Sequence, residues 1–99
     1  MITIATIQAR VASHFGFTVA ELWGRRRFRR VSGARAIALY LARELIGASY
    51  PEIGQRFGGM DHTSVIYAHR RVASSPALLA EAQALASELN PTPPAPVSA

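Results

Sequence analysis

The glycine pair Gly58-Gly59 most constrains how this chain can fold, because it separates two short segments that both favour helix. Ser49 can cap the first segment, and Pro51 is tolerated in its first turn, where the backbone N–H has no intrahelical partner. Glycine enters the left-handed region without steric cost, so the pair ends this helix and permits a tight change of direction. The stretch from Ser49 to Val72 is therefore predicted to form two helices joined by a glycine turn, a helix-turn-helix.

The second of these helices is predicted to be polar at its N-terminal end and apolar further on. Its first turn carries Asp61, His62, Thr63 and Ser64, and its packing side is formed by Val65, Ile66, Ala68, His69 and Val72. A helix fits the major groove of B-DNA, where short side chains can reach base edges. An aspartate can accept a hydrogen bond from cytosine N4, a histidine can bond to a base edge, and a threonine offers both a hydroxyl and a methyl group.

Positive charge is concentrated in the middle of the chain. The net charge is +5 and all eleven basic residues are arginine, whose planar fork suits phosphate and guanine edges. Ten of these arginines and only three acids lie in residues 25–71, whereas residues 72–99 carry two acids and no base. This distribution predicts a polyanionic partner, and the alternative is a basic solvated face with no ligand.

Five of the arginines occupy the six residues from Arg25 to Arg30. Like charges this dense repel one another, so the segment is predicted to be an exposed loop that binds DNA. The loop could read sequence through one arginine, or it could act only as a nonspecific set of phosphate contacts. Phe28 is expected to pack back onto the domain, and Trp23 is expected to close the core with Leu22 rather than stack on a base.

Hydrophobic periodicity predicts an all-α fold of five to six helices. The expected helices are a first one capped by Thr3 and reaching about His14, a short turn capped by Thr18 with Glu21, a long one over Ala34 to Ile46, the helix-turn-helix, and an amphipathic one over Pro76 to Leu89. The last helix is expected to pack against the long or the first helix, or to offer a face to a partner. Residues 1–89 form the expected domain, and the proline-rich residues 90–99 form an expected disordered tail.

The run Phe-Gly-Gly-Met-Asp-His-Thr-Ser-Val, at residues 57–65, resembles the signature Phe-Gly-Gly-Arg-Asp-His-Thr-Thr-Val of the C-terminal DNA-binding domain (domain IV) of the bacterial replication initiator DnaA. Leu22 to Arg30 resembles the basic loop of that family, Arg35 to Leu45 its long helix, and Tyr50 to Gly54 its Leu-Pro-Glu-Ile-Gly. The resemblance implies a compact helical domain similar to the Trp repressor. The sequence has no GxxxxGK[ST] motif, so we expect a freestanding relative without the ATPase module.

The resemblance also implies which residues touch DNA. Family positions that read the TTATCCACA-like DnaA box, with an arginine in the minor groove, match the base contacts Arg27, Asp61, His62, Thr63, Tyr50 and Pro51. The expected phosphate contacts are Arg25, Arg26, Arg29, Arg30, Arg35, Arg43, Ser64, Arg70 and Arg71. Three departures from the family pattern, at Met60, Ser64 and Ala36, each remove a group that could contact DNA and are expected to relax specificity.

These observations predict a DnaA-box binder that modulates replication initiation or nearby transcription, double-stranded DNA being its partner. The alternative is a regulator that binds the initiator or its partners while binding DNA weakly, and a general transcription regulator or phage-derived DNA binder is a third possibility. No enzyme activity, cofactor or metal is expected, because Asp61 and His62 point along different directions of one helix and no nucleophile is placed by a turn. The absence of cysteine and of a long apolar run favours a cytoplasmic protein with no membrane segment. A monomer is expected, because the sequence shows no zipper or obvious dimer seam and the expected DNA site is asymmetric.

Overall fold

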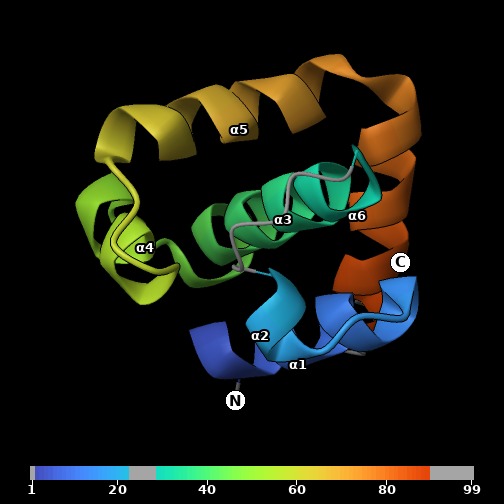
Figure 1. Ribbon diagram of the computed structural model, residues 1–99. Coiled ribbons are helices and arrows are strands. Elements are labelled where there is room, and N and C mark those ends of the chain that lie inside the picture. The colour runs from blue at the N-terminus through green and yellow to red at the C-terminus, as the bar shows by residue number, and fades with distance from the viewer. Residues whose placement is uncertain (1, 23–28, 90–99) are drawn as a thin grey trace, which may run out of the picture.

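The computed structural model describes residues 2–22 and 29–89, which form helices and no strand (Figure 1). In chain order the elements are α1 (Ile4–Phe15), α2 (Val19–Leu22), α3 (Arg29–Leu41), the π-helical turn η1 (Ala42–Ile46), α4 (Tyr50–Arg56), α5 (His62–Ser74) and α6 (Pro76–Leu89). The predicted all-α fold is confirmed. The predictions for Trp23, for Arg25 to Phe28 and for the tail at 90–99 fall outside the described residues.

Helix α3 is the centre of the domain. In Figure 1 it runs through the middle of the molecule, with α5 on one side and α1 on the other, while α4 lies at one end and α6 at the other. Its Ala34, Ile37 and Ala38 are completely buried. Small residues let neighbouring helices approach closely, and the long side chains of those neighbours then fill the space between them. Helix α3 therefore supports both α5 on one side and α1 on the other.

The helix ends agree with the capping pattern expected from the sequence. Thr3 Oγ1 accepts a hydrogen bond from Thr6 N at 3.1 Å and begins α1. Thr18 and Glu21 form a reciprocal capping box, with Thr18 N donating to Glu21 Oε1 at 2.8 Å and Glu21 N to Thr18 Oγ1 at 3.1 Å. These bonds satisfy backbone groups that the helices leave unpaired at their first turns, so each start is encoded locally.

The long helix ends at Ile46 as predicted, just before Gly47 in the left-handed conformation, but the prediction for its start was wrong. It begins at Arg29 rather than Ala34, so Arg29 and Arg30 are helical and do not belong to an exposed loop. Arginine is a good helix former, and Val31 in the same first turn is buried, which anchors this extension to the core. The last turn, η1, is a π-helix, whose wider i→i+5 spacing carries Arg43 and Glu44.

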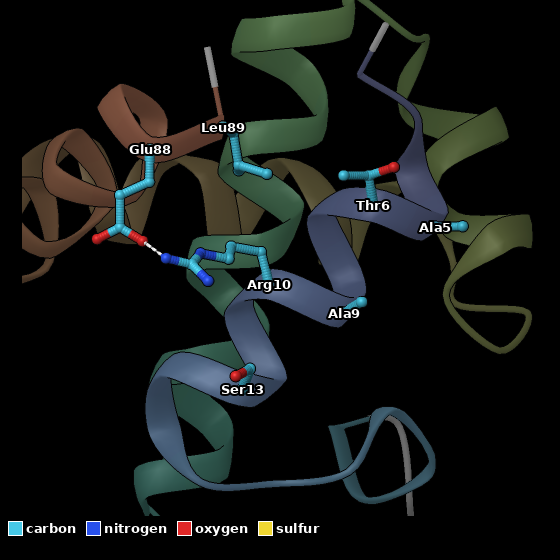
Figure 2. Close-up of a pocket in the computed structure, with 7 residues that line it drawn as sticks. All are labelled: Ala5, Thr6, Ala9, Arg10, Ser13, Glu88 and Leu89. Carbon is cyan, nitrogen blue, oxygen red and sulfur yellow. Dashed lines mark hydrogen bonds and ion pairs between the residues drawn. The ribbon is translucent and has the colours of Figure 1, made fainter. Parts of the chain in front are cut away.

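Helix α6 packs against α1, α3 and α5, as one of the two readings of its sequence predicted. Its Ala82 and Leu85 are completely buried. Figure 2 shows Arg10 of α1 reaching across the shallow groove between the two helices to form an ion pair with Glu88 of α6. Nearby, His14 Nε2 lies 2.9 Å from Glu81 Oε2. The apolar side of α6 therefore belongs to the core. None of the described helices is long and apolar enough to cross a bilayer.

Replacing Leu85 tests this role of α6. Leu85→Ala should lower the free energy of unfolding by about 2–5 kcal/mol, because the truncated side chain leaves a cavity in a packed core. The matched control is Gln83→Ala on the exposed side of the same helix, which should stay within about 0.5 kcal/mol of the wild type in urea unfolding. Equal stability of the two variants would show that α6 does not contribute to the core.

Candidate nucleic-acid interface

The predicted helix-turn-helix is formed by α4, a short turn and α5. Ser49 Oγ accepts a hydrogen bond from Glu52 N at 3.2 Å and caps α4. Gly58 and Gly59 have φ angles of +83° and +77°, the left-handed conformation that other residues adopt only with strain. Phe57, just before them, is buried. The chain can therefore turn sharply between the two helices while Phe57 keeps the turn attached to the core.

A third glycine, Gly54, allows the turn to lie directly on α4. Met60 N donates a hydrogen bond to Gly54 O at 2.8 Å. A Cβ atom at position 54 would overlap the carbonyl oxygen of Met60 and would lie 3.1 Å from its carbonyl carbon. Glycine is therefore required here by contact between two backbone segments, and this contact fixes where α5 begins relative to α4.

Asp61 is the N-cap of α5 and not a residue of its first turn, which corrects the sequence-based placement. Its Oδ2 accepts a hydrogen bond from Thr63 N at 3.0 Å. Bonding first from the Thr63 side chain and then from the Thr63 backbone lowers the pKa of Asp61 below its usual value. The side chain of Asp61 is nevertheless 66% exposed, so its carboxylate can cap the helix and also reach a base edge.

His62 and Thr63 follow in the first turn of α5 and are exposed. His62 Nδ1 lies 3.7 Å from Asp61 Oδ1, and its side chain is 56% exposed. Figure 1 shows this end of α5 next to α4. Pro51 of α4 is exposed and Tyr50 is half-buried. The five described residues predicted to contact bases therefore lie on two neighbouring helix starts, and their contacts with DNA stay a prediction.

Three of the predicted phosphate contacts meet in a groove between α3 and α5. Arg35, Ser64 and Arg71 line this groove together with Ser32 and Tyr67. Arg71 Nη1 donates to Ser32 Oγ at 2.9 Å, and Arg35 Nε donates to the carbonyl oxygen of Leu22 at 2.6 Å. Arg71 is thereby held on a serine hydroxyl and Arg35 on a backbone carbonyl. The groove brings both guanidinium groups together with Ser64, a donor set suited to a phosphate.

The other predicted phosphate contacts are dispersed. Arg43 is half-buried at the entry to α4, where its Nη1 donates to Ala48 O at 2.9 Å, and Arg70 is exposed on α5. The side chains of Arg29 and Arg30 are not among the described parts of the structure, so their roles stay predictions.

Tyr67 is the residue of this surface that the sequence-based reasoning missed. It is 73% exposed and lies four residues after Thr63, so both side chains share one face of α5. The signal was available, because Tyr67 falls outside the stripe formed by Val65, Ala68 and Val72. Met60, by contrast, is partly buried and packs against the core, so it replaces the family arginine with a packing residue.

Within residues 2–22 and 29–89, no group of three His, Asp or Glu side chains could hold a metal ion.

The fold and the exposed end of α5 define a helix-turn-helix DNA-binding domain. A sequence model of the bacterial DnaA protein helix-turn-helix matches residues 4–72 of this chain. The chain therefore belongs to that family.

Three relatives illustrate the similarity, and each is named chromosomal replication initiator protein DnaA. The protein of Latilactobacillus sakei is 50% identical over 74 residues, which is 75% of this chain and 16% of the relative. That of Lactiplantibacillus plantarum is 42% identical over 88 residues, or 89% of this chain and 19% of the relative, and that of Zymomonas mobilis is 45% identical over 71 residues, or 72% and 15%. The chain thus spans less than a fifth of the length of these relatives.

Two glycine substitutions should have opposite effects on stability. Gly54→Ala should lower the free energy of unfolding by about 1–3 kcal/mol, because the new methyl group pushes the Met60 backbone away from α4. Gly33→Ala is the matched control within α3, where the new Cβ would lie 3.6 Å from Leu78 Cδ2, an ordinary contact. It should raise the same quantity by about 0.5–1 kcal/mol through helix propensity. Urea unfolding measures both, and a stabilised Gly54→Ala would contradict the backbone contact.

The Asp61 cap should make stability depend on acid pH. Because the pKa of Asp61 is lower in the folded than in the unfolded chain, its contribution is present above the unfolded value of about 3.9 and is lost as the pH falls through the lower folded value. Asp61→Asn keeps a capping side chain but cannot titrate. The free energy of unfolding of the wild type minus that of Asp61→Asn, measured by thermal unfolding, should therefore be more positive at pH 6 than at pH 2.5. A difference that stays constant over this range would disprove the titration.

Proposed function

We propose that this chain binds double-stranded DNA at DnaA-box-like sequences and thereby modulates the initiation of chromosome replication, or transcription near such boxes, without supplying ATPase activity. Asp61, His62 and Thr63 read bases in the major groove, and Tyr50 and Pro51 contact the DNA from α4. Arg27 contributes from the minor groove. The protein acts in the cytoplasm, on the nucleoid, and binds as a monomer because the DnaA box is asymmetric.

The proposal depends chiefly on the start of α5. His62 and Thr63 are exposed directly after a cap that fixes their backbone. The groove formed by Arg35, Ser64 and Arg71 lies along the same helix and can hold the phosphate backbone. Base-reading and backbone-binding groups are thus available on one surface.

Titration of two duplexes, one carrying TTATCCACA and one with the same bases scrambled, tests the proposal. The wild-type chain should prefer the box, and His62→Ala or Thr63→Ala should each reduce box affinity about 5- to 150-fold, since a base-specific contact contributes about 1–3 kcal/mol. Affinity for the scrambled duplex should change less than about twofold. The control is Arg70→Ala, which should weaken both duplexes equally and lower the slope of log K against log salt by about one.

Equal affinity of the wild-type chain for the two duplexes would reject sequence-specific binding. An unchanged salt slope for Arg70→Ala would remove that residue from the phosphate contacts and leave the base-reading set untouched.

The alternative function, a regulator that binds the initiator through α6, receives less support. This alternative was motivated by the arginine lost at Met60 and by the leucine-rich last helix. In that helix Leu85 is completely buried, and Leu78, Leu79 and Leu89 pack against the core. Among the described residues, the exposed large hydrophobic side chains are Val19, Ile46 and Tyr67, and none of these belongs to α6. Substitution of Leu85 would therefore disturb the fold before it disturbed a partner.

A further inference from the structure

His69 stands at the junction of the elements that carry the DNA-binding surface. It projects from the inner side of α5, and its side chain is only 19% exposed. Its ring stacks on Tyr40 of α3, with centroids 4.8 Å apart and planes inclined by 28°. Tyr50, at the start of α4, makes a T-shaped contact with the same ring, with centroids 6.1 Å apart. The imidazole of α5 therefore contacts both α3 and α4.

A hydrogen bond and a cation–π contact extend this junction to η1. His69 Nε2 lies 2.9 Å from Glu44 Oε2, and because a carboxylate only accepts, the histidine donates this bond. The guanidinium carbon of Arg43 lies 4.5 Å from the centroid of the Tyr50 ring, while its Nη1 bonds to Ala48 O. Tyr50 is thus held between His69 and Arg43.

This aromatic junction, defined by Tyr40, Arg43, Glu44, Tyr50 and His69, joins two predicted DNA contacts, Arg43 and Tyr50, to three residues that were not predicted to touch DNA. Burial and then the negative charge of Glu44 raise the pKa of Tyr40, so the acid and the ring are close in the folded chain. Most of the His69 ring is covered by neighbouring side chains, among them Tyr40 and Tyr50. The junction has the arrangement of a support rather than of a contact surface.

We propose that His69 is a positioning residue for DNA recognition: it holds Tyr50, and with it the start of α4, at a fixed distance from the start of α5. The inference rests on the proposed function, because Tyr50 and Pro51 on one helix and His62 and Thr63 on the other must meet one DNA duplex together. A base contact depends on alignment within hydrogen-bonding distance, so a small displacement between the two helix starts weakens specific contacts more than phosphate contacts. His69 consequently affects preference for a sequence more than affinity for DNA.

The test measures box preference, the ratio of affinities for the TTATCCACA and scrambled duplexes, at a temperature where circular dichroism shows every variant fully folded. His69→Ala should reduce this ratio about tenfold while affinity for the scrambled duplex stays within about twofold. His69→Phe keeps a ring between Tyr40 and Tyr50 and should retain the ratio within about threefold of the wild type. In a double-mutant cycle, Tyr50→Ala should change the ratio much less in the His69→Ala background than in the wild type, because both act through the same alignment.

The matched control is Val72→Ala, a completely buried position on the same inner side of α5 that belongs to none of the contacts of the junction. It should destabilise the chain and leave the box preference within about twofold of the wild type. Four outcomes would overturn the positioning role alone. The box preference could survive His69→Ala, or it could fall equally with Val72→Ala. It could be lost in His69→Phe as fully as in His69→Ala, or the effects of His69→Ala and Tyr50→Ala could be additive. Absence of any preference in the wild-type chain would instead reject the proposed function together with the positioning role.

Discussion

The hydrogen bond from Met60 N to Gly54 O, made where two backbone segments touch without a side chain between them, is the constraint on which the proposed DNA-binding surface depends. It sets the distance between the end of α4 and the start of α5. Asp61 then caps α5 one residue later, so the cap, the exposed His62 and the exposed Thr63 all follow from the same contact. The bond also pairs backbone groups that would otherwise need another partner, so the turn is connected to α4 by backbone as well as by the buried Phe57.

Helix α3 serves both the core and the surface. Its fully buried Ala34, Ile37 and Ala38 receive the outer helices, while Arg35 on the same helix faces the groove beside α5. Its later residue Tyr40 supports His69, and the π-helical turn that follows places Arg43 and Glu44 at the entry to α4 and against α5. Core packing and presentation of charge are therefore coupled, so a substitution that shifts α3 would move the arginine groove and the aromatic junction together.

Much of this arrangement could be predicted from the sequence because its signals are local. The caps at Thr3, Thr18 and Ser49, the glycine turn and the burial of α6 depend on residues a few positions apart or on hydrophobic spacing, and the structure agrees with them. The predicted start of α3 was wrong because that prediction rested on repulsion within the arginine run. In the structure the buried Val31 anchors the first turn of α3 to the core. Tyr67 was not predicted because hydrophobic spacing identifies only the packing stripe of α5, and Tyr67 lies outside that stripe.

By itself the sequence determined the all-α class, the position of the helix-turn-helix and the concentration of arginine around it, since periodicity, capping and charge are properties of neighbouring residues. Only the tertiary structure decided which side chains meet across the chain. Glu44 and His69, Ser32 and Arg71, and the Gly54 backbone and Met60 come together through helix packing, which no local pattern specifies. The division has a physical reason: a helix forms from interactions within a few residues, whereas the distances between helices are set by how all the buried side chains fill one common core.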